Sequence, residues 1–152
     1  MTKILMVCLG NICRSPLAEG LLRAKVDDSK IIVDSAGLDK WHVGEAPCKT
    51  SQEIAGNHGL NISNLRARHF KVSDFDQFDK IFIMDNLNHK LIMKMARNQD
   101  DIDKVDYILN EVFPFEDLEV PDSYQKGNNA AEIVFEMLDQ ATIRIAQKYS
   151  DA

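Results

Sequence analysis

A short apolar run that ends in a cysteine constrains this chain more than any other stretch. Residues 3–7 are mostly apolar, which is typical of a strand buried on both faces of a sheet. Residues 8–16 follow with the sequence Cys-Leu-Gly-Asn-Ile-Cys-Arg-Ser-Pro, and apolar residues then recur at helical spacing. Strand, tight loop and helix in this order predict the first half of a βαβ unit.

The rest of the chain continues this alternation. Further strands are predicted at residues 30–35, 80–84 and 105–109, and helices at 48–58, 73–76, 86–96 and from about 128. The first helix is expected to begin with Ser15 as N-cap and Pro16 as first helical residue. We therefore predict one α/β domain over residues 1–152. It is a three-layer sandwich in which helices flank a four-stranded, mainly parallel sheet, the first strand is central, and a phosphate-binding loop follows it.

The loop at residues 8–14 has the residue types of an anion-binding site. Backbone N–H groups that lead into a helix N-terminus attract an oxyanion, and Gly10 and Asn11 tolerate the left-handed conformations that such a loop needs. Arg14 offers a planar fork for two phosphate oxygens, and Ser15 can donate a hydrogen bond to a thiolate at Cys8. A cysteine that ends a buried strand is more often only a packing residue. The convergence of the neighbouring residue types favours the anion loop.

Charge and composition exclude other classes. The chain has 18 basic and 24 acidic residues and a net charge of −6, which argues against a nucleic-acid-binding protein. Three cysteines and the lack of a predicted signal peptide or membrane span indicate the reducing cytoplasm. We expect no metal and no other cofactor, because the histidines show no metal-ligand spacing with the cysteines and are interpreted as surface or packing residues. These are His42, His58, His69 and His89.

Residues 8–16 resemble the signature of the low-molecular-weight protein tyrosine phosphatases, and weaker blocks resemble that family along nearly the whole chain. They are Asp34-Ser35-Ala36-Gly37, Trp41-His42-Val43-Gly44, Ala67-Arg68, Phe82-Ile83-Met84-Asp85 with Asn88, and Val120-Pro121-Asp122. The resemblance implies a protein tyrosine phosphatase in which Cys8 attacks phosphorus to give a cysteinyl-phosphate and Arg14 holds the phosphoryl oxygens. Asp122 would be the general acid and then the general base. The phosphate-binding loop would include Leu9, Gly10, Asn11, Ile12, Cys13 and Ser15.

The sequence departs from the family pattern at two positions. Ser123 stands where relatives usually have proline, so the loop of the general acid is expected to be less rigid. Leu65 replaces a histidine that often braces the phosphate-binding loop, so the bracing is expected to rest on Asn11 and Ser35. By resemblance, Trp41 and Tyr124 would be the walls that hold the substrate ring, although both are also compatible with ordinary surface or core positions.

Other residues keep two interpretations at this stage. Cys13 either packs under the helix or, as the resemblance implies, forms a reversible disulfide with Cys8 that protects the nucleophile. Cys48 is interpreted as structural. Asp85 is interpreted as a residue that braces the loop or caps a helix rather than as a catalytic one.

Two alternative functions remain open. Arsenate reduction occurs on the same fold but needs further cysteines, usually beyond the third strand, and this chain has none after Cys48. A catalytically weakened phosphotyrosine-binding module is suggested only by Ser123. The expected partner is a tyrosine-phosphorylated protein, with a bacterial tyrosine kinase as one candidate, and neither nucleic acid nor a membrane. The protein is expected to be a monomer or a weak oligomer.

Overall fold

A computed structural model describes residues 1–123 and 126–150 of the chain. Its sheet has four strands, β1 (Thr2–Cys8), β2 (Ile31–Gly37), β3 (Lys80–Ile83) and β4 (Val105–Tyr107). They lie in the order β2-β1-β3-β4, and all three pairings are parallel. The predicted α/β class, the parallel sheet and the interior position of the first strand are therefore confirmed.

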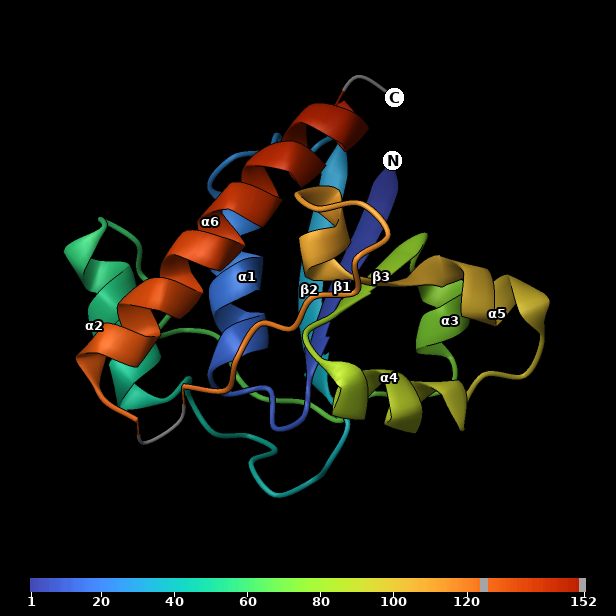
Figure 1. Ribbon diagram of the computed structural model, residues 1–152, viewed down its shortest axis with the longest axis horizontal. Helices are drawn as coiled ribbons and strands as arrows, with labels where there is room; N and C mark the ends of the chain where they lie inside the picture. The colour runs from blue at the N-terminus through green and yellow to red at the C-terminus, as the bar shows by residue number, and fades with distance from the viewer. Residues whose placement is uncertain (124–125, 151–152) are drawn as a thin grey trace.

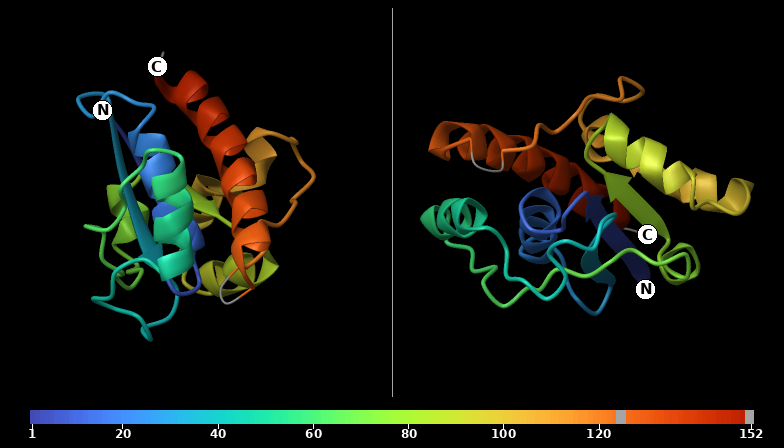
Figure 2. Two further views of the ribbon diagram at one scale, coloured as in Figure 1. Left: turned by 90° about the vertical axis from the view of Figure 1, so that its left-hand side faces the viewer. Right: turned by 90° about the horizontal axis from the view of Figure 1, so that it is seen from below.

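Helices cover both faces of this sheet (Figures 1 and 2). The elements are α1 (Arg14–Arg23), α2 (Lys49–Asn57), α3 (Asp74–Gln77), α4 (Asn86–Met93), α5 (Gln99–Lys104), the 3₁₀ helix η1 (Ile108–Glu111) and α6 (Asn128–Ser150). The α1, α2 and α6 helices lie on one side, and α3, α4 and α5 lie on the other. Of the helices described, none is both long and apolar enough to span a bilayer.

Alternation along β1 divides the core into two layers. Ile4, Met6 and Cys8 point to the layer that contains α1 and α6. Leu5 and Val7 point to the opposite layer, which contains Phe70 and Phe75. Because all five side chains are buried, β1 is packed on both faces. Its last residue, Cys8, therefore has a fixed position at the carboxyl end of the strand.

Several predicted boundaries differ from the structure. Helix α1 begins at Arg14 and its N-cap is Cys13 without a side-chain cap, so the prediction of Ser15 as N-cap is wrong. The predicted helix at 86–96 ends at Met93, and a separate helix, α5, was not predicted. The fourth strand ends at Tyr107, because the chain turns into η1.

Candidate active site

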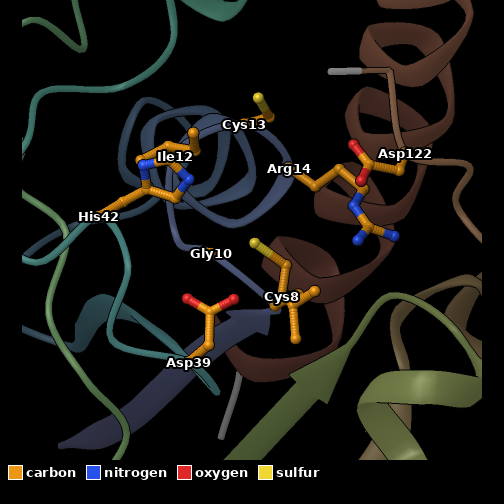
Figure 3. Close-up of a pocket in the computed structure, with 9 residues that line it drawn as sticks. Cys8, Gly10, Ile12, Cys13, Arg14, Asp39, His42 and Asp122 are labelled. Carbon is orange, nitrogen blue, oxygen red and sulfur yellow. The ribbon is translucent and has the colours of Figure 1, made fainter. Parts of the chain in front are cut away.

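The loop between β1 and α1 lies at the carboxyl ends of the parallel strands, where ligands bind in such sheets. A pocket opens over it (Figure 3). Its lining residues are Cys8, Leu9, Gly10, Ile12, Cys13, Arg14, Asp39, His42 and Asp122. The structure thus brings together residues from the N-terminal loop, from the segment after β2 and from the segment before α6.

Asn11 holds the loop in shape from behind the pocket. Its φ of 56° is left-handed, as its residue type predicted. Its Nδ2 donates to Ser15 Oγ at 2.8 Å and to Ser35 Oγ at 2.9 Å. Its Oδ1 accepts from the backbone N–H of Arg68 at 3.0 Å. The predicted brace of Asn11 and Ser35 is therefore present, while Leu65 packs against the core.

These hydrogen bonds orient the hydroxyl of Ser15 toward Cys8. Ser15 Oγ accepts the amide proton of Asn11, so its own proton is available to Cys8 Sγ, which lies 3.0 Å away. A thiolate is an acceptor only, and a hydroxyl that points at it stabilises the charged form. Ser15 lies within α1, after the N-cap position at Cys13, so its side chain serves the thiol and not the helix end.

A buried carboxyl group ends the network. Ser35 Oγ donates to Glu19 Oε1 at 2.6 Å, and Arg23 pairs with the other oxygen of Glu19 at 2.7 Å. Burial raises the pKa of Glu19, against the opposing effects of Ser35 and Arg23. The hydroxyl groups of Ser15 and Ser35 each accept one hydrogen bond and donate another. The directions of the hydrogen bonds between Glu19 and Cys8 are therefore fixed.

Arg14 is buried, with 3% of its surface exposed. Its Nη1 donates to Asp85 Oδ2 at 2.7 Å and to the carbonyl of Val120 at 2.9 Å. Burial lowers the pKa of Arg14, but Cys8 and Asp85 outweigh burial and raise it, so the guanidinium remains charged. Asp85 also caps α4 through Asn88 N at 2.8 Å, and it therefore has both roles that the sequence suggested.

Two glycines lie where the loop is closely approached by other segments. A Cβ at Gly37 would lie 2.9 Å from the carbonyl oxygen of Leu9, so only glycine lets β2 end against the loop. Gly10 does not have the predicted left-handed conformation. Its role is space, since a Cβ there would lie 3.1 Å from Cδ2 of His42.

Of the two predicted substrate walls, Trp41 is described by the structure, and it is not among the residues that line this pocket. Trp41 is 84% exposed and lines a neighbouring hollow with Leu38, Asp39, Lys40 and His69 instead. Tyr124 lies outside the described residues. Asp39 and His42 also line the pocket. Neither residue was predicted to have a role of its own at the site, and His42 was interpreted as a surface or packing residue. The length of the loop after β2, which is typical of functional loops, was one signal for this segment.

This geometry defines a class of protein. An oxyanion loop that encloses a thiol, with an arginine and a carboxyl group at its rim, serves phosphoryl transfer through a covalent cysteine intermediate. No cluster of His, Cys, Asp and Glu suited to a metal ion is found among residues 1–123 and 126–150.

Comparison with known proteins identifies the family. The profile of the family "Low molecular weight phosphotyrosine protein phosphatase" matches residues 3–151, and the chain belongs to this family. A putative low molecular weight protein-tyrosine-phosphatase of Synechocystis sp. is 39% identical over 143 residues, which are 91% of this chain and 90% of that protein. YfkJ of Bacillus subtilis, another low molecular weight protein-tyrosine-phosphatase, is 39% identical over 134 residues, 84% of each chain.

Solved structures agree with the sequence relatives. A protein tyrosine phosphatase from Entamoeba histolytica, crystallised with Hepes in its active site, superposes with a TM-score of 0.91 at 30% identity. The match covers 99% of this chain and 98% of that one. The chain is therefore a protein tyrosine phosphatase of this family by fold and by sequence.

Proposed function

We propose that Cys8, Arg14 and Asp122 catalyse the hydrolysis of phosphotyrosine in proteins. The observation that carries the proposal is that all three residues line one pocket, although Asp122 is more than a hundred residues away in sequence. In Figure 3 the carboxyl group of Asp122 lies on the same side of the pocket as Arg14, above the sulfur of Cys8. A nucleophile, an anion clamp and a proton donor are the parts that hydrolysis of an aryl phosphate requires.

In the first step the Cys8 thiolate attacks phosphorus in line with the phenolic oxygen. The S–P bond forms and the P–O bond breaks, while Arg14 and the N–H groups of residues 9–13 hold the three equatorial oxygens as their charge develops. Asp122 gives its proton to the leaving phenolate. In the second step Asp122 takes a proton from water as the water attacks the cysteinyl-phosphate, and Cys8 leaves as a thiolate beside the Ser15 hydroxyl.

The depth of the pocket favours tyrosine over serine. Cys8 is only 3% exposed, so a phosphate reaches the sulfur only at the end of a long side chain. A phenyl ring spans that depth, whereas the single methylene of phosphoserine leaves the peptide backbone against the rim. We propose tyrosine-phosphorylated proteins, a bacterial tyrosine kinase among them, as partners of a single-domain cytoplasmic enzyme that is a monomer or a weak oligomer.

Substrate profiling tests this function. We expect the wild-type protein to hydrolyse para-nitrophenyl phosphate and a phosphotyrosyl peptide in the presence of EDTA, because the proposed mechanism uses no metal. A phosphoseryl peptide of the same sequence is expected to react at least about a hundredfold more slowly, since it loses the oriented contact between thiolate and phosphorus. Phosphate release measures all three reactions.

Other outcomes would contradict the proposal. Binding of the phosphotyrosyl peptide without turnover would favour the binding module. Consumption of arsenate with thioredoxin, without turnover of aryl phosphates, would favour arsenate reduction. Equal rates on both peptides would overturn the argument from pocket depth.

A substitution of Arg14 tests the anion clamp. Lysine keeps the charge but has no planar fork, so it cannot contact two phosphoryl oxygens while it also bonds Asp85 and Val120 O. We expect Arg14→Lys to lower kcat by about a hundredfold, a typical cost for one lost oxyanion contact. Arg66→Lys is the control, because Arg66 is exposed and donates to the backbone carbonyls of Ser63 and Leu65. Similar losses in both variants would contradict the clamp.

A further inference from the structure

Cys13 and Cys48 lie against each other beside the pocket. Cys13 is buried and lines the pocket of Cys8, whereas Cys48 is half-buried and immediately precedes α2. Together with Ile12 and Ala67 they form a small apolar cluster apart from the two layers of the core. All three cysteines are free thiols in the structure.

The backbone holds these two cysteines close enough for a disulfide. The N–H of Cys48 donates to the carbonyl of Ile12 at 2.7 Å. Cys48 therefore contacts the peptide group that joins Ile12 to Cys13. Ser51 ties the same segments together, because its Oγ donates to the carbonyl of Cys13 at 3.1 Å. These two bonds hold the segments of Cys13 and Cys48 together, and the hydrogen bond between the two side chains brings their sulfurs into contact, as a disulfide requires.

A hydrogen bond joins the two sulfurs and shifts the pKa values of the two thiols in opposite directions. The side-chain hydrogen bond with Cys13, together with the side-chain and backbone hydrogen bonds of Ser51, lowers the pKa of Cys48 and outweighs burial, which raises it. The same bond to Cys48, together with burial, raises the pKa of Cys13. Cys48 also stands at the N-cap of α2, where the helix dipole favours a negative charge. The hydrogen bonds and the helix position therefore favour negative charge on Cys48, whereas the surroundings of Cys13 favour its neutral thiol.

The orientation of Cys13 matches this pairing. In Figure 3 the sulfur of Cys13 is directed away from the sulfur of Cys8. A disulfide between Cys8 and Cys13, which the family resemblance implied, thus requires Cys13 to turn from Cys48 toward the pocket. Once turned, Cys13 is still next to Cys48 in the fold, and Cys48 has a thiolate available for attack.

We propose that Cys48 is the resolving thiol of a relay that returns oxidised Cys8 to its thiolate and leaves a disulfide between Cys13 and Cys48. The relay rests on the function proposed above, because it needs Cys8 as the nucleophile of the pocket. Its oxidant is a hydroperoxide.

Three steps balance the chemistry. The Cys8 thiolate attacks one oxygen of hydrogen peroxide, the O–O bond breaks, and hydroxide leaves and takes up a proton to become water. Cys13 then attacks the sulfenic sulfur of Cys8, the S–O bond breaks, and a second water leaves with the proton of Cys13. Finally the Cys48 thiolate attacks the sulfur of Cys13 and Cys8 leaves as a thiolate, stabilised by Ser15 at 3.0 Å. Two thiols are oxidised and one peroxide is reduced.

Disulfide mapping and recovery of turnover test the relay. Wild type and Cys48→Ser are treated with hydrogen peroxide, quenched with catalase without a thiol reductant, alkylated and digested with trypsin. The wild-type product is expected to link peptide 4–14 to peptide 41–49, with Cys8 alkylated. Turnover of para-nitrophenyl phosphate after the quench is expected to be roughly tenfold higher in wild type than in Cys48→Ser, since only wild type can release Cys8 by exchange.

The controls separate the relay from the proposed function. Serine is a good N-cap, so Cys48→Ser is expected to have the turnover of wild type before peroxide is added. A bond confined to peptide 4–14, or equal recovery of both proteins, would overturn the relay. Absence of turnover before oxidation would overturn the proposed function instead. In that case the disulfide mapping would still show whether Cys13 and Cys48 form a bond.

Discussion

Replacement of Cys8 by serine is expected to abolish turnover while the protein still binds phosphotyrosine. An alkoxide is far harder to form than a thiolate, so the nucleophile is lost, and kcat should fall by roughly 10⁴-fold or more. The fold should persist, because a serine hydroxyl fits where Cys8 Sγ already lies 3.0 Å from Ser15 Oγ. The variant also lacks the negative charge that repels the incoming phosphate. Its affinity for a phosphotyrosyl peptide should therefore equal or exceed that of wild type.

Calorimetric titration with the peptide, beside steady-state turnover, measures both quantities. Cys48→Ser is the matched control, since it makes the same chemical change outside the phosphate-binding loop. Turnover of Cys8→Ser within about tenfold of wild type would show that another group is the nucleophile, because loss of a true nucleophile costs far more. Loss of binding together with turnover would show that Cys8 supports the loop rather than the reaction.

The layers of the fold were predictable because local patterns determine them. Residues 3–7 form a continuous apolar run, and such a run is stable only as an interior strand. The end of α4 was not predictable from periodicity. Asn98 caps α5 by accepting from Asp101 N at 2.9 Å, and Arg97 binds Asp76 of the α3 helix at 2.6 Å. These contacts start a separate helix at Gln99, which the spacing of apolar residues after Asn86 did not indicate.

The same distinction holds at the candidate site. The loop was predictable because its residues are contiguous and their types converge on one kind of ligand. Asp39 and His42 were not, because contacts between distant segments bring them to the pocket. Backbone bonds from Leu38 N to Cys8 O at 3.1 Å and from Asp39 N to Leu9 O at 3.0 Å fix the second loop on the first. They place Asp39 at the pocket and leave Trp41 outside it.

Arg14 links the loop to the segment of the proposed general acid. Its bond to the Val120 carbonyl, and the bond of Val120 N to Met84 O at 2.7 Å, fix the chain two residues before Asp122. Val120 is buried, and the ring of Pro121 fixes its own φ and restricts the backbone of Val120 before it. Ser123, where the sequence departs from the family pattern, therefore follows a backbone segment that is already fixed at Val120. Ser123 itself is buried and its carbonyl accepts from Lys126 N at 3.0 Å, so Asp122 is held from both sides.

That anchoring makes Asp122→Ala the most informative test of the second half of the site. Removal of a positioned general acid is expected to lower kcat by about 10²–10³-fold for phenyl phosphate, whose leaving phenolate needs a proton. The loss should be smaller for para-nitrophenyl phosphate, because para-nitrophenolate is stable without one. A series of aryl phosphates should therefore show a steeper dependence of kcat on the pKa of the leaving phenol in the variant than in wild type.

Glu116→Ala provides the control for this series. Glu116 is an exposed carboxylate of the same segment, so its removal changes the charge equally but takes no group from the pocket. Its kcat should follow the wild-type dependence on the leaving group. An equal loss across the series in Asp122→Ala would mean that Asp122 contributes only charge or position, and the proton would have to come from another donor. A steeper dependence confined to Asp122→Ala would assign the proton transfer to this carboxyl group, because only a proton donor distinguishes among leaving groups.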